Sequence, residues 1–222
     1  MTIYNCDYRE IMPSLTRGGI DLVITDPPYG MEYHSGRYIG ANPHPPITND
    51  DRYPAEIVPV LRGIARKAVF LFCRWDNLPE VEPPKSFIAM IKNSWTAGDL
   101  NGAFARQWEG ILFYPCEEFS FNTRLPDVID CRRVPPANLL HPTQKPEYPI
   151  GILLQACSNA NDLVFDPFLG SGTTAFCAKK LNRYSIGIEI EEKYCEIAAK
   201  RCSQEVMELN FNPNPENNPA GH

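Results

Sequence analysis

The sequence lacks the signatures of several broad protein classes. Its 8 cysteines form no C-x-x-C pair and most lie in apolar or helical runs, which argues against a disulfide framework or a zinc site. No apolar run approaches the roughly 18 residues that a membrane-spanning helix requires, and the N-terminus has no basic stretch followed by an apolar one. We therefore expect a cytoplasmic protein with buried free thiols, no bound metal and no membrane partner.

Positive charge is also scarce. The formal net charge is −6, which argues against a protein that merely coats nucleic acid but is compatible with an enzyme that has a local basic face. The 222 residues suit one domain. The 22 prolines gather in loops, and the last cluster indicates a disordered tail over residues 210–222. We expect one domain over residues 1–209, in which 31–52 forms a flexible substrate loop.

Apolar and amphipathic runs alternate along much of the chain. Expected strands lie at 2–5, 20–25, 68–73, 86–94, 109–114, 162–165 and 185–189, and expected helices lie at 8–15, 55–66, 150–157, 173–181 and 192–209. Residues 115–140 are irregular and mixed in charge. Strands that alternate with helices predict an α/β fold whose mostly parallel sheet is covered by helices on both faces.

The segment Asp26-Pro27-Pro28-Tyr29 directly follows the expected strand 20–25. Each proline fixes its own φ and removes a backbone donor, so the turn is stiff and its carbonyls are free to accept hydrogen bonds. Acceptors beside an aromatic face suit a planar ring with an exocyclic NH2, such as a nucleobase. The alternative is a proline-stiffened loop that binds a partner domain as an extended ligand, and the buried strand before the segment disfavours it.

A second segment, Gly170-x-Gly172-x-x-Ala175, follows the expected strand 162–165 and satisfies a fingerprint for dinucleotide binding. Glu189 ends the next strand, where an acid accepts from ribose hydroxyls. Asp166, just before the glycines, would repel a pyrophosphate but favour a cationic ligand. This pattern favours S-adenosylmethionine, with its sulfonium, over NAD. A glycine-rich turn without a ligand is the remaining alternative.

A third segment, His141-Pro142-Thr143-Gln144-Lys145-Pro146, precedes the expected helix 150–157. Thr143 and Lys145 place polar groups on a proline-braced loop upstream of the glycine turn. Taken alone, such a loop is also typical of a helix cap.

Together the three segments resemble the amino-group DNA methyltransferases, which modify adenine N6 or cytosine N4. The catalytic segment precedes the cofactor segment, which resembles the permuted beta arrangement of that family. The resemblance implies a Rossmann-like, circularly permuted domain in which strands 162–165 and 185–189 are built as if they came first, followed by 2–5 and 20–25. The cofactor and catalytic turns would then meet at the carboxyl ends of adjacent strands.

The resemblance also implies roles for individual residues. Asp26, Pro27, Pro28 and Tyr29 would hold the amine of a flipped base. S-adenosylmethionine would be bound by a set drawn from all three segments and from Cys6-Asp7, namely Asp7, Thr143, Lys145, Asp166, Phe168, Gly170, Ser171, Gly172, Thr173 and Glu189. No metal is implied.

The expected reaction is site-specific methylation of adenine N6 in double-stranded DNA, with cytosine N4 as the alternative. Residues 115–140 form a short target-recognition segment, where Arg124, Arg132 and Arg133 are candidates to contact DNA. Target recognition would rest on few contacts, be shared with loop 31–52, or be completed by the second subunit of a homodimer. A cognate restriction endonuclease is a further open partner.

An NAD-dependent oxidoreductase leaves Asp26-Pro27-Pro28-Tyr29 unexplained. A catalytically inactive nucleic-acid-binding module and an enzyme that methylates RNA or protein also remain open.

Overall fold

The structure is a computed structural model that describes residues 1–31, 48, 50–96 and 104–203. The expected tail over 210–222, residues 204–209 of the expected last helix and most of the expected substrate loop lie outside the described residues. Within the part of the chain that is described, no helix combines the length and apolar character needed to cross a membrane.

In the described residues, eight strands form one sheet in the order β1-β8-β7-β2-β3-β5-β4-β6. The pairs from β1 to β3 and the pair β4–β6 are parallel, whereas β5 runs antiparallel to both of its neighbours. The predicted mostly parallel sheet is therefore confirmed. The strands are β1 (Thr2–Asn5), β2 (Ile20–Thr25), β3 (Ala65–Cys73), β4 (Ser86–Thr96), β5 (Arg106–Pro115), β6 (Val128–Cys131), β7 (Leu163–Asp166) and β8 (Tyr184–Glu189).

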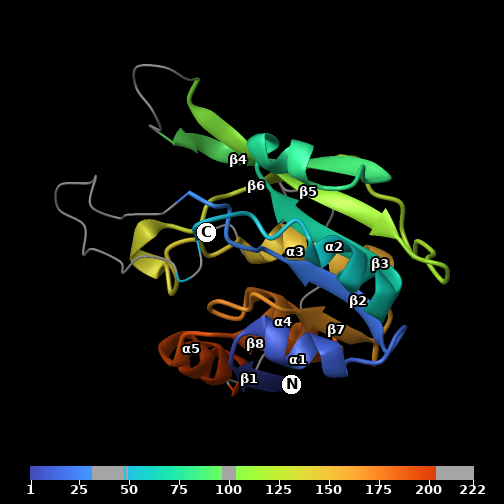
Figure 1. The fold of residues 1–222 in the computed structure, drawn as a ribbon. Coiled ribbons are helices and arrows are strands. Elements are labelled where there is room, and N and C mark those ends of the chain that lie inside the picture. Colours follow the sequence, from blue (N-terminus) through green and yellow to red (C-terminus); the bar gives the residue numbers. More distant parts are fainter. Residues whose placement is uncertain (32–47, 49, 97–103, 204–222) are drawn as a thin grey trace.

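Helices cover both faces of this sheet, as predicted (Figure 1). Helix α2 packs on one face, next to α1, while α3 and α4 pack on the other and α5 lies against α4. The helices are α1 (Tyr8–Ile11), α2 (Ile57–Ile64), α3 (Glu147–Cys157), α4 (Thr173–Lys180) and α5 (Glu192–Ser203), with 3-10 turns η1 (Met12–Ser14), η3 (Trp75–Glu80) and η4 (Pro136–Asn138).

Two predicted elements differ from the structure. The expected helix 8–15 is one α-helical turn followed by η1, because Pro13 has no amide hydrogen to continue the α-helical ladder. Strand β6 lies inside the segment 115–140, which was expected to be irregular. Its residues pair with Ala89 to Lys92 of β4, so the partner strand imposes the extended conformation.

Strand β2 lies at the centre of the sheet, and all of its residues are buried. Leu22 and Ile24 face the core that α3 and α4 cover, whereas Val23 faces the core beneath α2. Burial on both faces explains why its sequence is continuously apolar rather than alternating. Asp21 is the exception, and its carboxylate pairs with Arg66 and accepts from the amide of Leu163 at 2.8 Å.

The neighbours of β2 determine where the chemistry lies. Strand β7 pairs with β2 through Leu22–Val164 and Val23–Phe165, so both strands end at the same edge of the sheet. The hydroxyl of Thr25 donates to Oδ1 of Asp166 at 2.7 Å, which joins the residues that precede the two predicted turns. The expected adjacency of the catalytic and cofactor strands is therefore confirmed.

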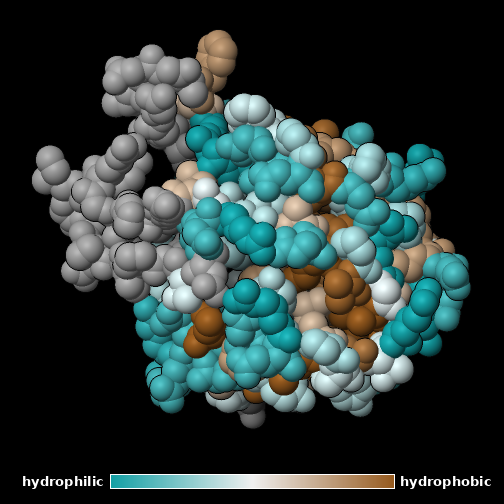
Figure 2. All heavy atoms as spheres, in the orientation of Figure 1, coloured by the Kyte–Doolittle hydropathy of each residue, from teal (hydrophilic) through white to brown (hydrophobic). Residues whose placement is uncertain are grey.

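The face of the molecule that carries α1 and α2 is largely polar. Figure 2 shows one face, in the orientation of Figure 1, on which hydrophilic side chains predominate and apolar ones gather around the middle, over the region between α1 and α2. Ile11 of α1 and Leu15, just after η1, are partly buried against the core beneath α2. On this face, a small group of exposed apolar side chains is therefore surrounded by polar ones.

Candidate active site

A cavity of about 290 Å³ opens at the carboxyl edge of the parallel strands. It is lined by residues that follow β1, β2, β7 and β8 and by the loop before α3. The predicted site residues in its lining are Asp7, Asp26, Pro27, Pro28, Tyr29, Thr143, Lys145, Asp166, Phe168, Gly170, Ser171, Thr173 and Glu189. Gly172 stands directly behind them as the N-cap of α4. One cavity thus brings together segments that are far apart in the sequence.

The carboxylate of Asp26 is held by two donors. The hydroxyl of Tyr29 donates to Oδ1 at 2.6 Å, and the ammonium of Lys145 donates to Oδ2 at 2.5 Å. Burial raises the pKa of Asp26, and the positive charge of Lys145 opposes that rise. Asp26 is therefore a partly buried acceptor whose charge depends on Lys145.

The backbone after Tyr29 is fixed from two sides. Oδ1 of Asp50 accepts from the amides of Gly30 at 2.9 Å and Met31 at 3.2 Å, while the amide group of Asn77 donates to the Tyr29 carbonyl at 3.2 Å. Gly30 has φ +71, and a Cβ there would lie 2.9 Å from the backbone of Arg52. These contacts set the direction of the catalytic turn. No sequence motif indicated that Asp50 or Asn77 would contact this turn.

Lys145 connects the catalytic turn to the antiparallel part of the sheet. Its ammonium lies 3.3 Å from Oε2 of Glu109 on β5, and Glu109 also pairs with Lys92 of β4. The same ammonium lies over the rings of Tyr29 at 5.3 Å and Phe72 at 5.2 Å. The positive charge of Lys145 thus interacts with both acidic and aromatic partners. Glu109 belongs to no sequence motif, so its contact with Lys145 could not be predicted.

The glycine turn after β7 is shaped by backbone that favours glycine. Gly170 and Gly172 have φ +52 and +80, in the left-handed region. The amide of Gly170 donates to Oε2 of Glu189 at 2.8 Å, and the amide of Glu191 donates to Oε1 at 2.8 Å. The amide of Ile190 also stabilises the carboxylate. Because a carboxylate can accept about four hydrogen bonds, Glu189 retains capacity to accept from a ligand hydroxyl. Burial raises the pKa of Glu189, and these backbone donors oppose the rise.

Asp166 lies buried beneath the glycine turn. Its Oδ1 accepts from the hydroxyl of Thr25 and from the amide of Phe168 at 3.1 Å. Burial raises its pKa to about 6, so near neutral pH the group is predominantly ionised. An anion at this depth favours a cationic ligand and disfavours a pyrophosphate.

An ion cluster around the buried Arg201 anchors the glycine turn on the side of α3, α4 and α5. Arg201 of α5 donates to the hydroxyl of Thr173 at 3.1 Å and to the carbonyl of Ser171 at 3.4 Å. Its other terminal nitrogen pairs with Glu147 of α3 at 2.8 Å, and Lys180 of α4 pairs with the second oxygen of Glu147 at 2.8 Å. Three helices are thereby tied to one turn.

The remaining cofactor candidates form the rim of the cavity. Asp7 caps α1 and pairs with Arg9 at 2.6 Å, while the ring of Tyr8 packs against Phe168 with 4.9 Å between centroids. The hydroxyl of Thr143 lies 3.1 Å from Nδ1 of His141. The rim therefore combines an acid, aromatic rings and a hydroxyl.

Three predicted site residues stand apart from the cavity within the described chain. Arg124 and Arg132 are exposed, and Arg133 donates from its backbone to Asn93 at 3.0 Å and from Nε to the Ser94 carbonyl at 3.0 Å. The side chain of Arg133 is thus used in part to hold the segment after β6 against β4.

Comparison with known proteins connects this geometry to a family. The model of a DNA methylase family, N6/N4 methyltransferases, matches residues 66–200. The type II methyltransferase M.HpaI of Haemophilus parainfluenzae is 29% identical over 230 residues, which cover 88% of this chain and 72% of that protein. M2.LlaDCHI of Lactococcus lactis subsp. cremoris is 50% identical over 64 residues, which cover 29% of this chain and 24% of that protein.

Solved structures agree with the sequence comparison. The M1.HpyAVI–SAM complex superposes with a TM-score of 0.65 at 25% identity and covers 90% of this chain and 98% of that one. The cytosine-N4-specific PvuII DNA methyltransferase superposes with a TM-score of 0.69 at 14% identity, covers 96% of this chain and 88% of that one, and shares the fold. The predicted fold class is confirmed, and this chain belongs to the N6/N4 DNA methylase family.

Proposed function

We propose that this chain is a site-specific DNA methyltransferase that moves a methyl group from S-adenosylmethionine to the N6 amine of a flipped adenine. Family membership makes it an amino-group DNA methyltransferase, acting on adenine N6 or cytosine N4. S-adenosylmethionine is its cofactor, as the sequence predicts. The observation that carries the proposal is the partly buried Asp26 acceptor just past the end of β2, in the same cavity as Asp166 and the glycine turn.

The cavity suits this cofactor on its own chemistry. Asp166 provides a buried anion for a cationic ligand, and Glu189 keeps acceptor capacity for ribose hydroxyls. When bound, S-adenosylmethionine supplies an electrophilic methyl group on a sulfonium and leaves as a neutral thioether. The ring of Phe168 and the turn from Gly170 would hold its methionine and sulfonium region.

The chain's own residues would prepare the amine. Asp26 and the Pro27 carbonyl accept the two amine hydrogens, which directs the nitrogen lone pair away from the base ring and towards the methyl group. Tyr29 stacks on the flipped base, a contact worth roughly 1–3 kcal/mol in related systems. As the N–C bond forms and the C–S bond breaks, the nitrogen becomes positive, and Asp26 stabilises that charge until the proton leaves to solvent. Alignment and electrostatics supply most of the acceleration.

The choice of adenine is supported by the sequence of the catalytic turn. The family resemblance pairs an initial aspartate with adenine N6 and an initial serine more often with cytosine N4, and this chain has Asp26. The PvuII enzyme, described as cytosine-N4-specific, shares the fold, so the fold alone does not separate the two bases. Cytosine N4 is therefore the second candidate.

Double-stranded DNA, a homodimer and a cognate endonuclease are further proposals. Similarity to enzymes described as type II methyltransferases supports a restriction-modification setting. The roles of Arg124, Arg132 and Arg133 in DNA contact, the methyltransferase domain over 1–209 and the cytoplasmic location also stay predictions.

The decisive experiment measures the modified base directly. The purified chain is incubated with DNA from a methylation-free host and isotopically labelled S-adenosylmethionine, and the digested nucleosides are separated by mass spectrometry. N6-methyladenosine is the expected product. N4-methylcytidine would replace the adenine proposal by the second candidate, and unmodified DNA would contradict the proposed function.

A further inference from the structure

Four charged side chains from four separate segments form one chain of ion pairs beside the catalytic turn, in which Lys145 is buried and the other three are partly buried. Asp26 follows β2, Lys145 precedes α3, Glu109 lies on β5 and Lys92 lies on β4. Contacts run from Asp26 to Lys145 at 2.5 Å, from Lys145 to Glu109 at 3.3 Å, and from Glu109 to Lys92. Positive and negative groups alternate, so the removal of any one leaves its neighbours unbalanced.

We infer that Glu109 is a positioning residue for methyl transfer: it shares the ammonium of Lys145 with Asp26 and thereby releases an Asp26 oxygen to the target amine. This inference rests on the proposed function. Glu109 lies outside the lining of the cavity, so it acts through Lys145 rather than on the substrate.

Each oxygen of Asp26 already accepts one hydrogen bond. Tyr29 occupies Oδ1 and Lys145 occupies Oδ2. A base amine that donates to Asp26 must therefore share an oxygen with Tyr29 or Lys145, and Asp26 accepts from it more strongly when the ammonium shifts away. Lys145 is only 7% exposed, so water cannot take over the ammonium when it leaves Asp26. The ammonium requires another buried acceptor within reach.

Glu109 supplies that acceptor. Its Oε2 atom is shielded from water and makes no well-aligned hydrogen bond to any described residue, yet it lies 3.3 Å from the Lys145 nitrogen. The strand register explains this location, because Gly110 pairs with Cys73 at the end of β3, and Glu109 therefore lies just beyond that end. A small shift of the ammonium exchanges Asp26 for Glu109.

The charges around Asp26 support the same exchange. Burial raises the pKa of Asp26, Lys145 opposes the rise, and Glu109 adds to it. Burial also acts to raise the pKa of Glu109, but Lys145 and Lys92 outweigh it and lower that pKa to about 2, so Glu109 stays ionised. The titratable groups that face Asp26 or Glu109 from the packed elements are Tyr29, Tyr53, Cys73, Lys92, Cys131, Lys145 and Asp166.

The test replaces Glu109 by its neutral isostere, Glu109→Gln, in the full chain. Without the second carboxylate, Lys145 binds Asp26 alone, so Asp26 becomes a weaker acceptor with a lower pKa. We expect kcat for DNA methylation to fall about tenfold or more, the KM for S-adenosylmethionine to stay within about twofold, and the acidic limb of the kcat profile to move to lower pH.

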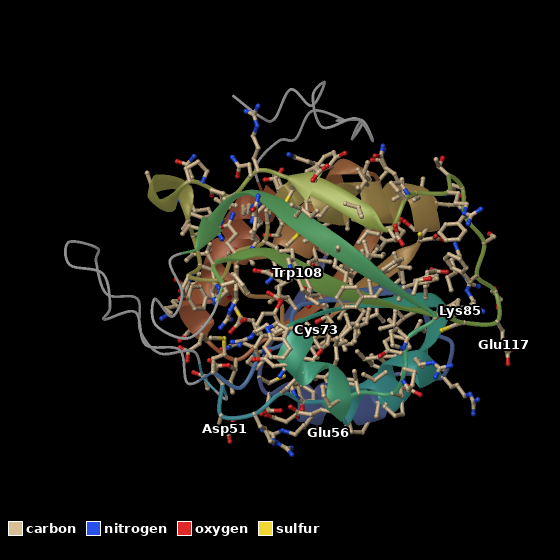
Figure 3. The ribbon with its side chains drawn as sticks, turned by 90° about the horizontal axis from the view of Figure 1, so that it is seen from above. Asp51, Glu56, Cys73, Lys85, Trp108 and Glu117 are labelled. Carbon is tan, nitrogen blue, oxygen red and sulfur yellow. The ribbon has the colours of Figure 1, made fainter. Side chains whose placement is uncertain are left out.

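Two further variants make the result specific. Glu117→Gln is the matched control, because Glu117 is exposed just past the other end of β5, at the edge of the molecule in Figure 3, and it should match wild type. Glu109→Asp retains the charge, so its kcat should fall less and its acidic limb should stay in place. It also serves as the test if the glutamine variant does not fold.

The outcomes separate the inference from the proposed function. An inactive wild-type chain that still binds S-adenosylmethionine would refute the proposed function. An active wild type together with a glutamine variant of unchanged kcat, or with a reduced kcat and an unmoved acidic limb, would overturn the role of Glu109. If the aspartate variant is used alone, a kcat equal to that of wild type would overturn it.

Discussion

The hydroxyl of Tyr29 donates a 2.6 Å hydrogen bond to Oδ1 of Asp26, so the catalytic turn binds its own acceptor. A base that stacks on Tyr29 and donates to Asp26 must share the carboxylate with this contact, which weakens Oδ1 as an acceptor. The ring and the hydroxyl of Tyr29 consequently have opposite effects on the reaction, since the ring binds the base and the hydroxyl occupies the acceptor.

Two substitutions separate those effects. Tyr29→Phe keeps the ring and frees Oδ1 of Asp26, so methyl transfer should stay within about threefold of wild type. Tyr29→Ala removes stacking worth roughly 1–3 kcal/mol, and kcat/KM for DNA should fall by about 5- to 150-fold. Steady-state methylation assays measure both, and a phenylalanine variant as impaired as the alanine variant would contradict the role of the ring.

Removal of the Asp26 carboxylate should separate chemistry from cofactor binding. Asp26→Ala deletes the acceptor that aligns the amine and stabilises its developing charge, so kcat should fall by about 10²–10³ or more. Glu109 remains to balance Lys145, and the glycine turn is untouched. Calorimetric titration with S-adenosylmethionine should give a dissociation constant close to that of wild type. Retained methylation by this variant would refute the catalytic assignment.

Gly30 and Gly63 should respond in opposite directions to alanine. Gly30 has φ +71, and an added Cβ would lie 2.9 Å from backbone atoms, so Gly30→Ala should lower the free energy of unfolding by about 1–3 kcal/mol. Gly63 lies in α2, and a Cβ there meets nothing within 4 Å. Gly63→Ala should therefore raise stability by about 0.5–1 kcal/mol. Denaturant unfolding measures both, and equal effects would exclude the strain at Gly30 as the cause.

Asp166 should make stability fall between about pH 4 and pH 6. Its pKa is raised by burial to about 6 in the folded state, from 3.8. Between these pH values the folded chain therefore binds a proton that the unfolded chain releases. The contribution of Asp166 to the free energy of unfolding is fully present below about pH 4 and is lost as the pH rises through about 6. Relative to the Asp166→Asn variant, the free energy of unfolding of wild type should fall by roughly 1.4 kcal/mol for each pH unit in this window. A flat difference between the two unfolding curves would contradict the shift.

Arg201 should support the cofactor turn through its buried contacts. Arg201→Met leaves Glu147 with fewer partners and removes the donors to Thr173 and Ser171, so unfolding should become easier by roughly 3 kcal/mol. Affinity for S-adenosylmethionine should fall with it. Lys200→Met changes the exposed neighbour on α5 and should leave both quantities near wild type. Similar losses in the two variants would indicate a general effect on the helix.

The parts that the sequence predicted well are those with local signals. The apolar run of β2 before two prolines, and the acid and glycines after β7, specify strand and turn from neighbouring residues alone. The family resemblance then implied that the two turns would meet, and the pairing of Val23 with Phe165 agrees with it.

Contacts between distant residues left no such signal. Lys145 was expected in the cofactor-binding set, but nothing in the sequence indicated that its ammonium pairs with Asp26, 119 positions away, and with Glu109. Asn77 and Glu109 have their roles because tertiary packing places them beside the catalytic turn. Strand β6 has four residues, too few for a periodic pattern to stand out from its irregular surroundings.

The hydrogen bond from Thr25 to Asp166 makes the two halves of the site one thermodynamic system. If a bound cofactor changes the geometry or charge of Asp166, that change reaches the strand that carries the catalytic turn. Such linkage is reciprocal, so a base seated on the turn would alter cofactor affinity by the same factor as the cofactor alters base affinity. Occupancy of either half would thus change the affinity of the other through a single hydrogen bond between neighbouring strands.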